Sequence, residues 1–283
     1  MRDASSIDVR FALGGPLLAA GGRVPRERNR PDAEAPTARS RRPASACTMN
    51  DRLIPELWEW AEYYCPWCYI AAVRLHRVAK EYEGRVTFRT RPFPLELAHG
   101  EAAPRDILQQ EWWLAAIQEP RAVFAPYRGD DWPTTTLPAF EAAWCAAQQG
   151  PVAAMEYDLR VRRAFFGEAR NIGRPQVLFD LAREAELDLT RFQAQWESGA
   201  ARAAVLAEAT LGRERYGVRG TPTLTLADGT HLKVPIAFPR LENRRIVGIS
   251  KLPCVGAGCD EAIHSLFERA LAGHGVGAVE ATT

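Results

Sequence analysis

The sequence predicts an α/β protein in which a long all-helical segment interrupts a strand–helix–strand unit and the strands that complete its sheet. Residues 57–64 form an aromatic-rich, extended run, and apolar residues at helical spacing follow them directly. One helical pattern after another then fills residues 100–213. Strand character returns at residues 223–234, after which the chain ends in one amphipathic helix. We therefore expect one sheet whose strands come from both ends of the folded chain.

Composition excludes several classes of protein. Of the 283 residues, 47% are hydrophobic and 25% are charged, which is typical of a globular protein. Residues 1–48 contain nine Arg and five acidic residues, a balance of +4, so the remainder carries −3 of the net +1. A mildly acidic remainder argues against a nucleic-acid partner. No apolar run reaches the 18 residues of a membrane span, so we also expect no membrane partner.

The predicted organisation has three parts. Residues 1–48 are rich in Arg, Pro, Ala, Gly and Ser with hardly any aromatic residues, so we expect a disordered leader. Met49 offers an alternative start. Residues 49–99 and 214–283 form the α/β domain, and residues 100–213 form the helical insertion. Glycine and proline interrupt the one candidate targeting segment, residues 11–20, so we predict a cytoplasmic protein and keep a signal peptide as the alternative.

The secondary-structure elements follow from local patterns. The strand at residues 57–64 leads into a helix from Pro66 to the glycine at position 84, and a second strand covers residues 85–93. Helical periodicity, opened in places by proline, predicts helices from Pro104, at 137–148, at 152–166, from Pro175, at 189–196 and at 203–216. A hairpin turn at 227–230 joins the strands at 223–226 and around Leu232. The last helix is expected to begin near Asp260 and to stop at Gly273.

The most informative motif is Cys65-Pro66-Trp67-Cys68, which stands where the first strand passes into the first helix. Pro66 suits the first helical position, because it lacks an N–H that would have no partner there. Free backbone N–H groups and the helix dipole favour an anion at this end, so we expect a lowered pKa for Cys65. The thiolate is the nucleophile in disulfide exchange. The motif therefore predicts Cys65 as the attacking cysteine and Cys68 as the resolving one.

Zinc binding is the alternative interpretation of the cysteines. Cys65, Cys68, Cys254 and Cys259 could together hold a zinc ion in a module without enzymatic activity. A bulky indole and a proline between the first two thiols, followed by a long helix, are unusual for a zinc pair. We therefore predict no metal site.

Three short segments resemble a known family. They are residues 64–70, the Ala164-Phe165-Phe166-Gly167-Glu168 segment, and residues 217–223 with Gly220-Thr221-Pro222-Thr223. In their order and spacing they resemble the DsbA-like branch of the thioredoxin superfamily, and within it the FrnE-like proteins, over about residues 53–272. The resemblance implies a thioredoxin-like fold interrupted by a helical domain, as in DsbA.

The resemblance also implies roles for individual residues. Pro222 would be a cis-proline that faces the two cysteines, and the backbone of Thr221 would bind an extended substrate as an added strand. Pro66 and Trp67 would complete the substrate-binding surface. Glu59 would be a buried acid beneath Cys68 that accepts its proton, although a solvated strand carboxylate is the simpler interpretation. Glu62, expected on the opposite face of the strand, is the natural comparison.

The remaining cysteines receive more modest predictions. Cys254 and Cys259 lie in a glycine-rich loop before the last helix, and we consider a second redox pair, a structural disulfide and unpaired thiols for them. Cys145 is expected to be a small buried hydrophobic residue. We assign no role to His76.

These observations favour a thiol–disulfide oxidoreductase of the DsbA-like class, an oxidoreductase or isomerase of protein disulfides that needs no bound cofactor. Its expected partners are protein or small-molecule disulfides and thiols, and a homodimer is compatible with the sequence. The alternative is a glutathione-dependent isomerase or transferase of the kappa type, which resembles this chain in architecture but usually has serine in place of the first cysteine. The sequence sets neither the reduction potential nor the direction of electron flow.

Overall fold

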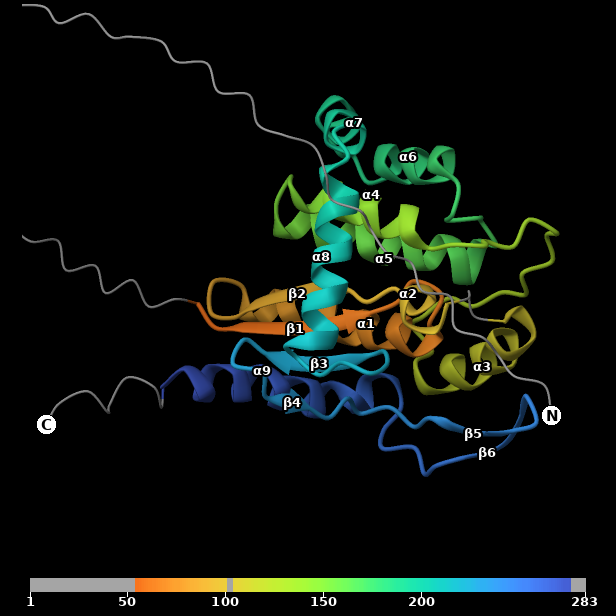
Figure 1. The fold of residues 1–283 in the computed structure, drawn as a ribbon. Coiled ribbons are helices and arrows are strands. Elements are labelled where there is room, and N and C mark those ends of the chain that lie inside the picture. Colours follow the sequence, from red (N-terminus) through yellow and green to blue (C-terminus); the bar gives the residue numbers. More distant parts are fainter. Residues whose placement is uncertain (1–53, 101–103, 276–283) are drawn as a thin grey trace, which may run out of the picture. The chain divides into compact units, whose positions relative to one another are not determined.

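Four strands, drawn from both ends of the folded chain, form the central sheet of the computed structural model (Figure 1). The structure describes residues 54–100 and 104–275, so the predicted leader at residues 1–48 lies outside the described residues. The strand order is β2-β1-β3-β4; β1 and β2 run parallel, and β3 and β4 are antiparallel to their neighbours. The strands are β1 (Glu56–Ala61), β2 (Thr87–Pro92), β3 (Thr223–Leu226) and β4 (His231–Leu232).

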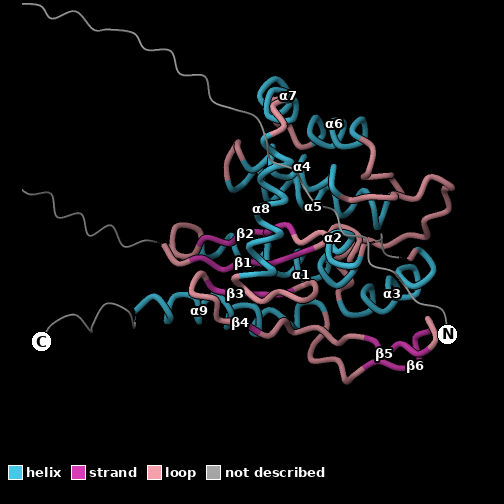
Figure 2. The backbone as a smooth tube through the Cα atoms, in the orientation of Figure 1, coloured by secondary structure: helices cyan, strands magenta, loops and turns pink. Residues whose placement is uncertain are grey.

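Helices cover both faces of this sheet. The first helix, α1 (Pro66–Ala79), and the last, α9 (Asp260–Gly275), pack against each other; α1 also contacts β2, and α9 contacts β1. A short 3-10 turn (Lys80–Tyr82) ends α1. Helix α8 (Ala200–Glu214) crosses the opposite face, as the tube in Figure 2 also shows. Because the chain enters α1 directly from β1, the start of α1 lies at the carboxyl end of the central strand.

Among the described residues between β2 and β3, all regular structure is helical. All the helices predicted there are present, with ends that differ by a few residues, and the short helix α2 was not predicted. They are α2 (Leu95–His99), α3 (Arg105–Gln118), α4 (Leu137–Ala147), α5 (Pro151–Glu168), α6 (Pro175–Glu184), α7 (Leu189–Glu197) and α8. Figure 1 shows α4 to α7 on one side of the sheet and α3 beyond the end of α1.

The two faces of β1 have different surroundings. Trp58 and Trp60 pack with Tyr216 in one cluster, whereas Leu57 and Ala61 belong to the main core. Alternation along a strand places Glu59 on the same side as Leu57, facing α1 rather than α8.

Helix α8 approaches the tryptophan face very closely. A Cβ atom on Gly212 would lie 2.7 Å from the indole of Trp60, so only glycine allows this packing distance.

Three sequence predictions need correction. Strand β1 ends at Ala61 rather than at residue 64, because its ladder with β2 stops there and the chain turns into α1. Glu62, expected on the opposite face of this strand from Glu59, therefore lies in the loop after it. The last helix runs to Gly275 rather than stopping at Gly273.

A second sheet, the hairpin of β5 (Pro239–Glu242) and β6 (Arg245–Ile249), was not predicted. Both residues of its connecting loop, Asn243 and Arg244, have positive φ, as a two-residue hairpin turn requires. Asparagine is common in such turns and arginine is not, so the sequence signal was only partial.

Candidate active site

The two motif cysteines lie in the first turn of α1. Cys65 is the N-cap residue with extended backbone angles, and Pro66 follows in the first helical turn as predicted. The backbone N–H of Cys68 donates to Sγ of Cys65 over 3.4 Å. Both cysteines are free thiols; Cys65 is 5% exposed and Cys68 is fully buried. Only Cys65 therefore presents its sulfur toward the surface.

A distant loop lies against the exposed sulfur. The peptide bond between Thr221 and Pro222 is cis, and Sγ of Cys65 lies 3.6 Å from the carbonyl oxygen of Thr221. The hydroxyl of Thr223 donates to the carbonyl of Gly220 and ties the turn together. The fold thus brings residues more than 150 positions apart into one site.

A pocket of about 300 Å³ opens beside Cys65. Trp67 forms part of its wall, and its ring centroid lies 5.7 Å from that of Phe238. Burial raises the pKa of Glu111, another lining residue, to about 7, although a hydrogen bond with Trp67 opposes this. The pocket is lined by Tyr64, Cys65, Pro66, Trp67, Leu95, His99, Pro104, Ile107, Leu108, Glu111 and Thr221.

The buried sulfur of Cys68 has a different environment. The backbone N–H of Glu62 donates to it over 3.5 Å. Burial raises the pKa of Cys68 well above its ordinary value, and hydrogen bonding with Cys65 and the nearby charge of Glu59 raise it further, whereas Arg162 lowers it. Cys68 is therefore a protonated thiol at neutral pH and needs a base before it can react.

Glu59 lies close enough to Cys68 for the two charges to interact, and it is not the solvated carboxylate of the simpler interpretation. Its side chain is fully buried, and neither carboxylate oxygen has a hydrogen-bond partner. Burial raises the pKa of Glu59 to about 8, despite the opposing effect of Arg162. The carboxyl group of Glu59 can therefore bind and release a proton near neutral pH.

Glu62 is also buried, so it does not serve as an exposed comparison. Its Oε1 accepts hydrogen bonds from the hydroxyl of Thr136 and from the backbone N–H of Tyr63, and its Oε2 accepts from the N–H of Leu95. Burial raises its pKa to about 7, and these hydrogen bonds limit the rise. Glu62 thus holds the loop between β1 and α1 in place.

Three buried polar residues close to this site received no role in the sequence analysis. Arg162 and Asp158 come from α5, and His76 comes from α1; all three are at most 3% exposed. Arg162 and Asp158 are four residues apart on one helix, a spacing typical of an exposed ion pair. The apolar run that follows them, Ala164-Phe165-Phe166, was the one signal that this helix is buried here.

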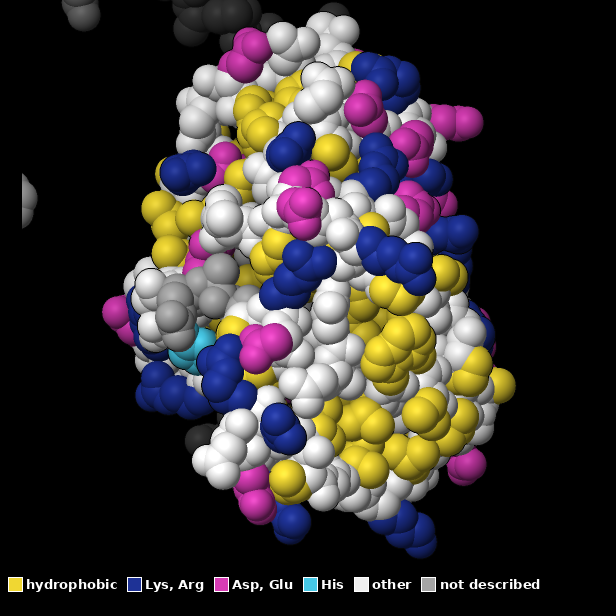
Figure 3. Space-filling view, turned by 90° about the vertical axis from the view of Figure 1, so that its right-hand side faces the viewer, with side chains coloured by type: hydrophobic (Ala, Val, Ile, Leu, Met, Phe, Trp, Pro, Cys, Tyr) yellow, Lys and Arg dark blue, Asp and Glu magenta, His cyan; other side chains and the backbone are white. Residues whose placement is uncertain are grey.

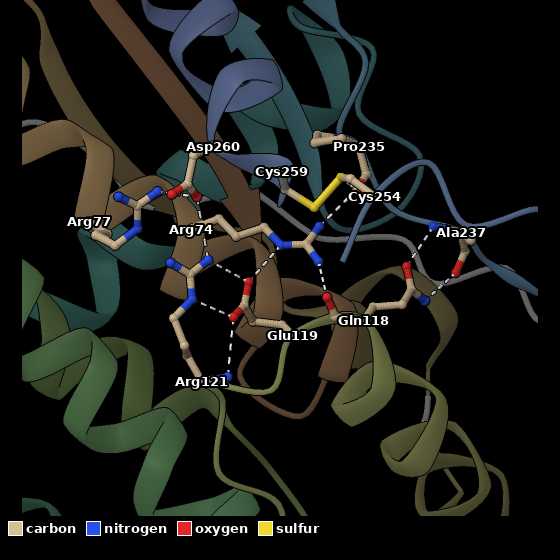
Figure 4. Close-up of a disulfide and its surroundings, with 10 residues drawn as sticks. All are labelled: Arg74, Arg77, Gln118, Glu119, Arg121, Pro235, Ala237, Cys254, Cys259 and Asp260. Carbon is tan, nitrogen blue, oxygen red and sulfur yellow. Dashed lines mark hydrogen bonds and ion pairs between the residues drawn. A yellow bond between two sulfur atoms is a disulfide. The ribbon is translucent and has the colours of Figure 1, made fainter. Parts of the chain in front are cut away.

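Cys254 and Cys259 form a disulfide, with sulfurs 2.11 Å apart (Figure 4). Beside it the fully buried ion pair of Arg74 and Glu119 joins α1 to the end of α3, and Arg74 also donates to the carbonyl of Pro235. The structure therefore does not gather the four cysteines into one cluster, and the described residues contain no group of three or more side chains that could hold a metal ion.

Exposed apolar residues surround the site on the side of the second hairpin. Figure 3 shows a broad apolar area on this face. Phe238 is exposed and contacts Trp67, and the hairpin packs against α3, which also carries exposed apolar side chains. Trp112, the residue before the exposed Trp113 on α3, is a core residue. The exposed residues are Trp113, Ile117, Phe238, Leu241, Val247 and Ile249.

A thiol pair at the start of a helix, opposite a cis-proline loop, defines the site of a thioredoxin-type protein. Residues 56–242 match the family of the DSBA-like thioredoxin domain, so the chain belongs to this family and the predicted fold class is confirmed. No curated protein matches the sequence.

Several solved structures share the fold. A candidate protein disulfide isomerase from Nitrosomonas europaea superposes with a TM-score of 0.57 at 19% identity, covering 78% of this chain and 98% of its own. The cytosolic disulfide reductase DsbM from Pseudomonas aeruginosa, solved with glutathione, gives 0.54 at 21% identity, with 77% and 99% covered. A candidate DsbA oxidoreductase from Streptomyces coelicolor gives 0.53 at 18% identity, with 81% and 93% covered. Within the described ranges, no helix of this chain is long and apolar enough to cross a membrane.

Proposed function

We propose that this protein exchanges thiols and disulfides through Cys65 and Cys68. The observation that carries the proposal is the asymmetry of the pair: Sγ of Cys65 faces the Thr221 carbonyl and the pocket, whereas Cys68 is buried behind it. In this arrangement Cys65 attacks a substrate disulfide and becomes bonded to one of its sulfurs. Cys68 then attacks Cys65, which closes the Cys65–Cys68 disulfide and releases the substrate thiol.

Glu59 is proposed as the base for the second step. Cys68 is protonated at neutral pH, and Glu59 is the buried carboxylate whose charge raises the pKa of Cys68. A carboxyl group with a pKa of about 8 is well matched to accept a thiol proton transiently and to release it again.

The surroundings favour a protein substrate. Exposed apolar side chains of α3 and of the β5–β6 hairpin extend from the pocket through the contact of Trp67 with Phe238. A polypeptide segment that flanks a disulfide can bury these side chains, and the loop at Thr221 offers it a backbone to pair with. Electron flow from this protein to its substrates, as in a cytosolic reductase, fits the predicted cytoplasmic location. The cytoplasmic location and the homodimer both stay predictions.

The kappa-type alternative gains no specific support. Glutathione carries two carboxylates, and among the described residues that line the pocket only His99 can carry a positive charge. DsbM, which was solved with glutathione, is similar in fold at 21% identity and does not decide this point.

Reduction of insulin in the presence of dithiothreitol tests the proposal. We expect the Cys65→Ser variant to lose activity and the Cys68→Ala variant to accumulate a mixed disulfide, detected by mass spectrometry. Cys145→Ser is the matched control, because Cys145 is a free, buried thiol in α4, away from the pocket. Full activity of Cys65→Ser would refute the proposal.

A further inference from the structure

Helix α5 of the helical segment contacts the β1–α1 loop beside Cys68. The Nε of Arg162 donates to Oδ2 of Asp158 over 2.9 Å, and its Nη1 donates to the carbonyl of Glu62 over 3.2 Å. The N–H of the same Glu62 donates to Sγ of Cys68. One residue of the β1–α1 loop therefore connects the guanidinium with the resolving sulfur.

Unpartnered polar atoms are concentrated at this point. Both carboxylate oxygens of Glu59, the Oδ1 of Asp158 and the Nη2 of Arg162 are buried without a hydrogen-bond partner. Leaving such groups unpaired in a core is costly, which suggests a role other than stability. Arg162 interacts electrostatically with both Glu59 and Cys68, so a charge that moves between these two groups stays near its guanidinium.

The charged and titratable groups around the site come from β1, α1, α5 and the loop after β1. Strand β1 contributes Glu59, α1 contributes Cys68 and His76, and α5 contributes Asp158 and Arg162. The loop contributes Glu62, whose pKa burial raises to about 7, and Tyr63, which lies under the guanidinium at 5.0 Å. His76 has its Nε2 3.4 Å from Oδ2 of Asp158 and 3.5 Å from the hydroxyl of Thr90, and its Nδ1 lies 3.1 Å from the carbonyl of Met155.

Only one of these groups is a cation at neutral pH. Burial lowers the pKa of His76 to about 4, so this imidazole is neutral. Burial also opposes the charge of Arg162, but Asp158 and Glu59 outweigh it and raise the pKa of Arg162, which stays protonated.

We propose that Arg162, held in place by Asp158, is a positioning residue for the resolving step, stabilising the negative charge as it moves from the Glu59 carboxylate to the Cys68 sulfur. The inference rests on the proposed exchange activity. In this step the S–H bond of Cys68 breaks and its proton passes to Glu59. The Cys68 sulfur then forms a bond with Cys65, and the bond from Cys65 to the substrate sulfur breaks. The enzyme is oxidised by two electrons, and the substrate leaves as a thiolate that takes a proton from solvent.

A stoichiometric reaction with 5,5′-dithiobis(2-nitrobenzoate) separates the two steps. The first thionitrobenzoate is released when Cys65 attacks, and the second is released when Cys68 resolves the mixed disulfide. Stopped-flow absorbance from pH 6 to pH 9 therefore gives a pH profile for each step in the full-length protein.

Variants with opposite expected signs make the test specific. Arg162→Met removes the cation, so we expect the midpoint of the second phase to rise by about 1 pH unit or more and its rate at pH 7 to fall about tenfold. Asp158→Asn removes a charge that raises the pKa of Glu59, so the midpoint of the second phase should fall in this variant. Arg162→Lys should restore most of the rate. The first phase should change little in all three.

The variants are chosen so that the test does not depend on one substitution that could prevent folding. Asp158 lines a pocket of about 420 Å³ between β2, α4, α5 and α8, so an asparagine there can be hydrated. If Arg162→Met does not fold, the Arg162→Lys and Asp158→Asn variants still decide. Arg163→Met is the matched control, since Arg163 is the next residue on α5 and its side chain is 61% exposed.

The results separate the two proposals. A wild-type protein that releases no second thionitrobenzoate overturns the proposed function itself. Alternatively, the wild type shows both phases, but the midpoint of the second phase is unchanged in Asp158→Asn and Arg162→Met, or moves in the same direction in both variants. That result overturns only the role of Arg162.

Discussion

Replacing Glu59 by glutamine should change how the stability of the protein depends on pH. The carboxyl group is fully buried, and burial raises its pKa from 4.5 to about 8. A raised pKa means that the folded protein binds the proton more tightly than the unfolded chain. The stability from this proton is therefore fully present below about pH 4.5 and is lost as the pH rises towards 8.

The size of the effect follows from the same values. A rise from 4.5 to about 8 corresponds to about 5 kcal/mol at about 1.4 kcal/mol per pKa unit. Between pH 5 and pH 8 the wild type should lose roughly 3.5 kcal/mol of this stabilisation, with a slope of about 1.4 kcal/mol per pH unit in the middle of the range. Glutamine cannot ionise, so the variant lacks this contribution. Glu62, with a pKa of about 7, contributes equally to both proteins and cancels in the comparison.

Urea unfolding at pH 5, 6, 7 and 8 measures the difference. The free energy of unfolding of Glu59→Gln, relative to the wild type, should increase by roughly 3.5 kcal/mol from pH 5 to pH 8. Glu83→Gln is the control, because Glu83 is exposed and its variant should follow the wild type throughout. A difference that is constant with pH would mean that Glu59 is ionised in the folded protein at pH 5. It would then refute both its raised pKa and its proposed part in proton transfer.

Other predictions concern the packing around the site. Gly212→Ala should lower the free energy of unfolding by about 1–3 kcal/mol, since its Cβ would overlap a rigid indole; chemical denaturation checks this. The Cys254→Ser/Cys259→Ser double variant should lose about 2 kcal/mol, the chain-entropy effect of so short a loop, and dithiothreitol should have the same effect on the wild type if it reduces this bond. Arg74→Met leaves the buried Glu119 with a weaker partner and should cost about 3 kcal/mol in the same assay, whereas an unchanged midpoint would mean that the pair is dispensable.

The helices and the position of the motif could be predicted from the sequence because they depend on local patterns. Pro66 at the start of α1 and the apolar spacing beyond it specify a helix whose first turn carries both thiols, whatever the rest of the chain does. The order of the motif and the Thr221-Pro222 segment indicated the family.

The hairpin of β5 and β6 shows where this reasoning failed. Its strands have alternating patterns too short to stand out, and its turn requires a positive φ at Arg244, which the residue type does not suggest.

The sequence by itself thus determined the two thiols, their spacing, and a helix start that favours an anion. The tertiary structure alone decided which groups surround them. Arg162 and Asp158 look like a solvated ion pair when read along α5, and Glu59 and Glu62 look alike along the chain. Folding buries all four, yet Glu62 receives several hydrogen bonds and the carboxylate of Glu59 receives none. Burial and hydrogen bonding set the proton affinity of a carboxyl group, and both depend on contacts between residues far apart in the sequence.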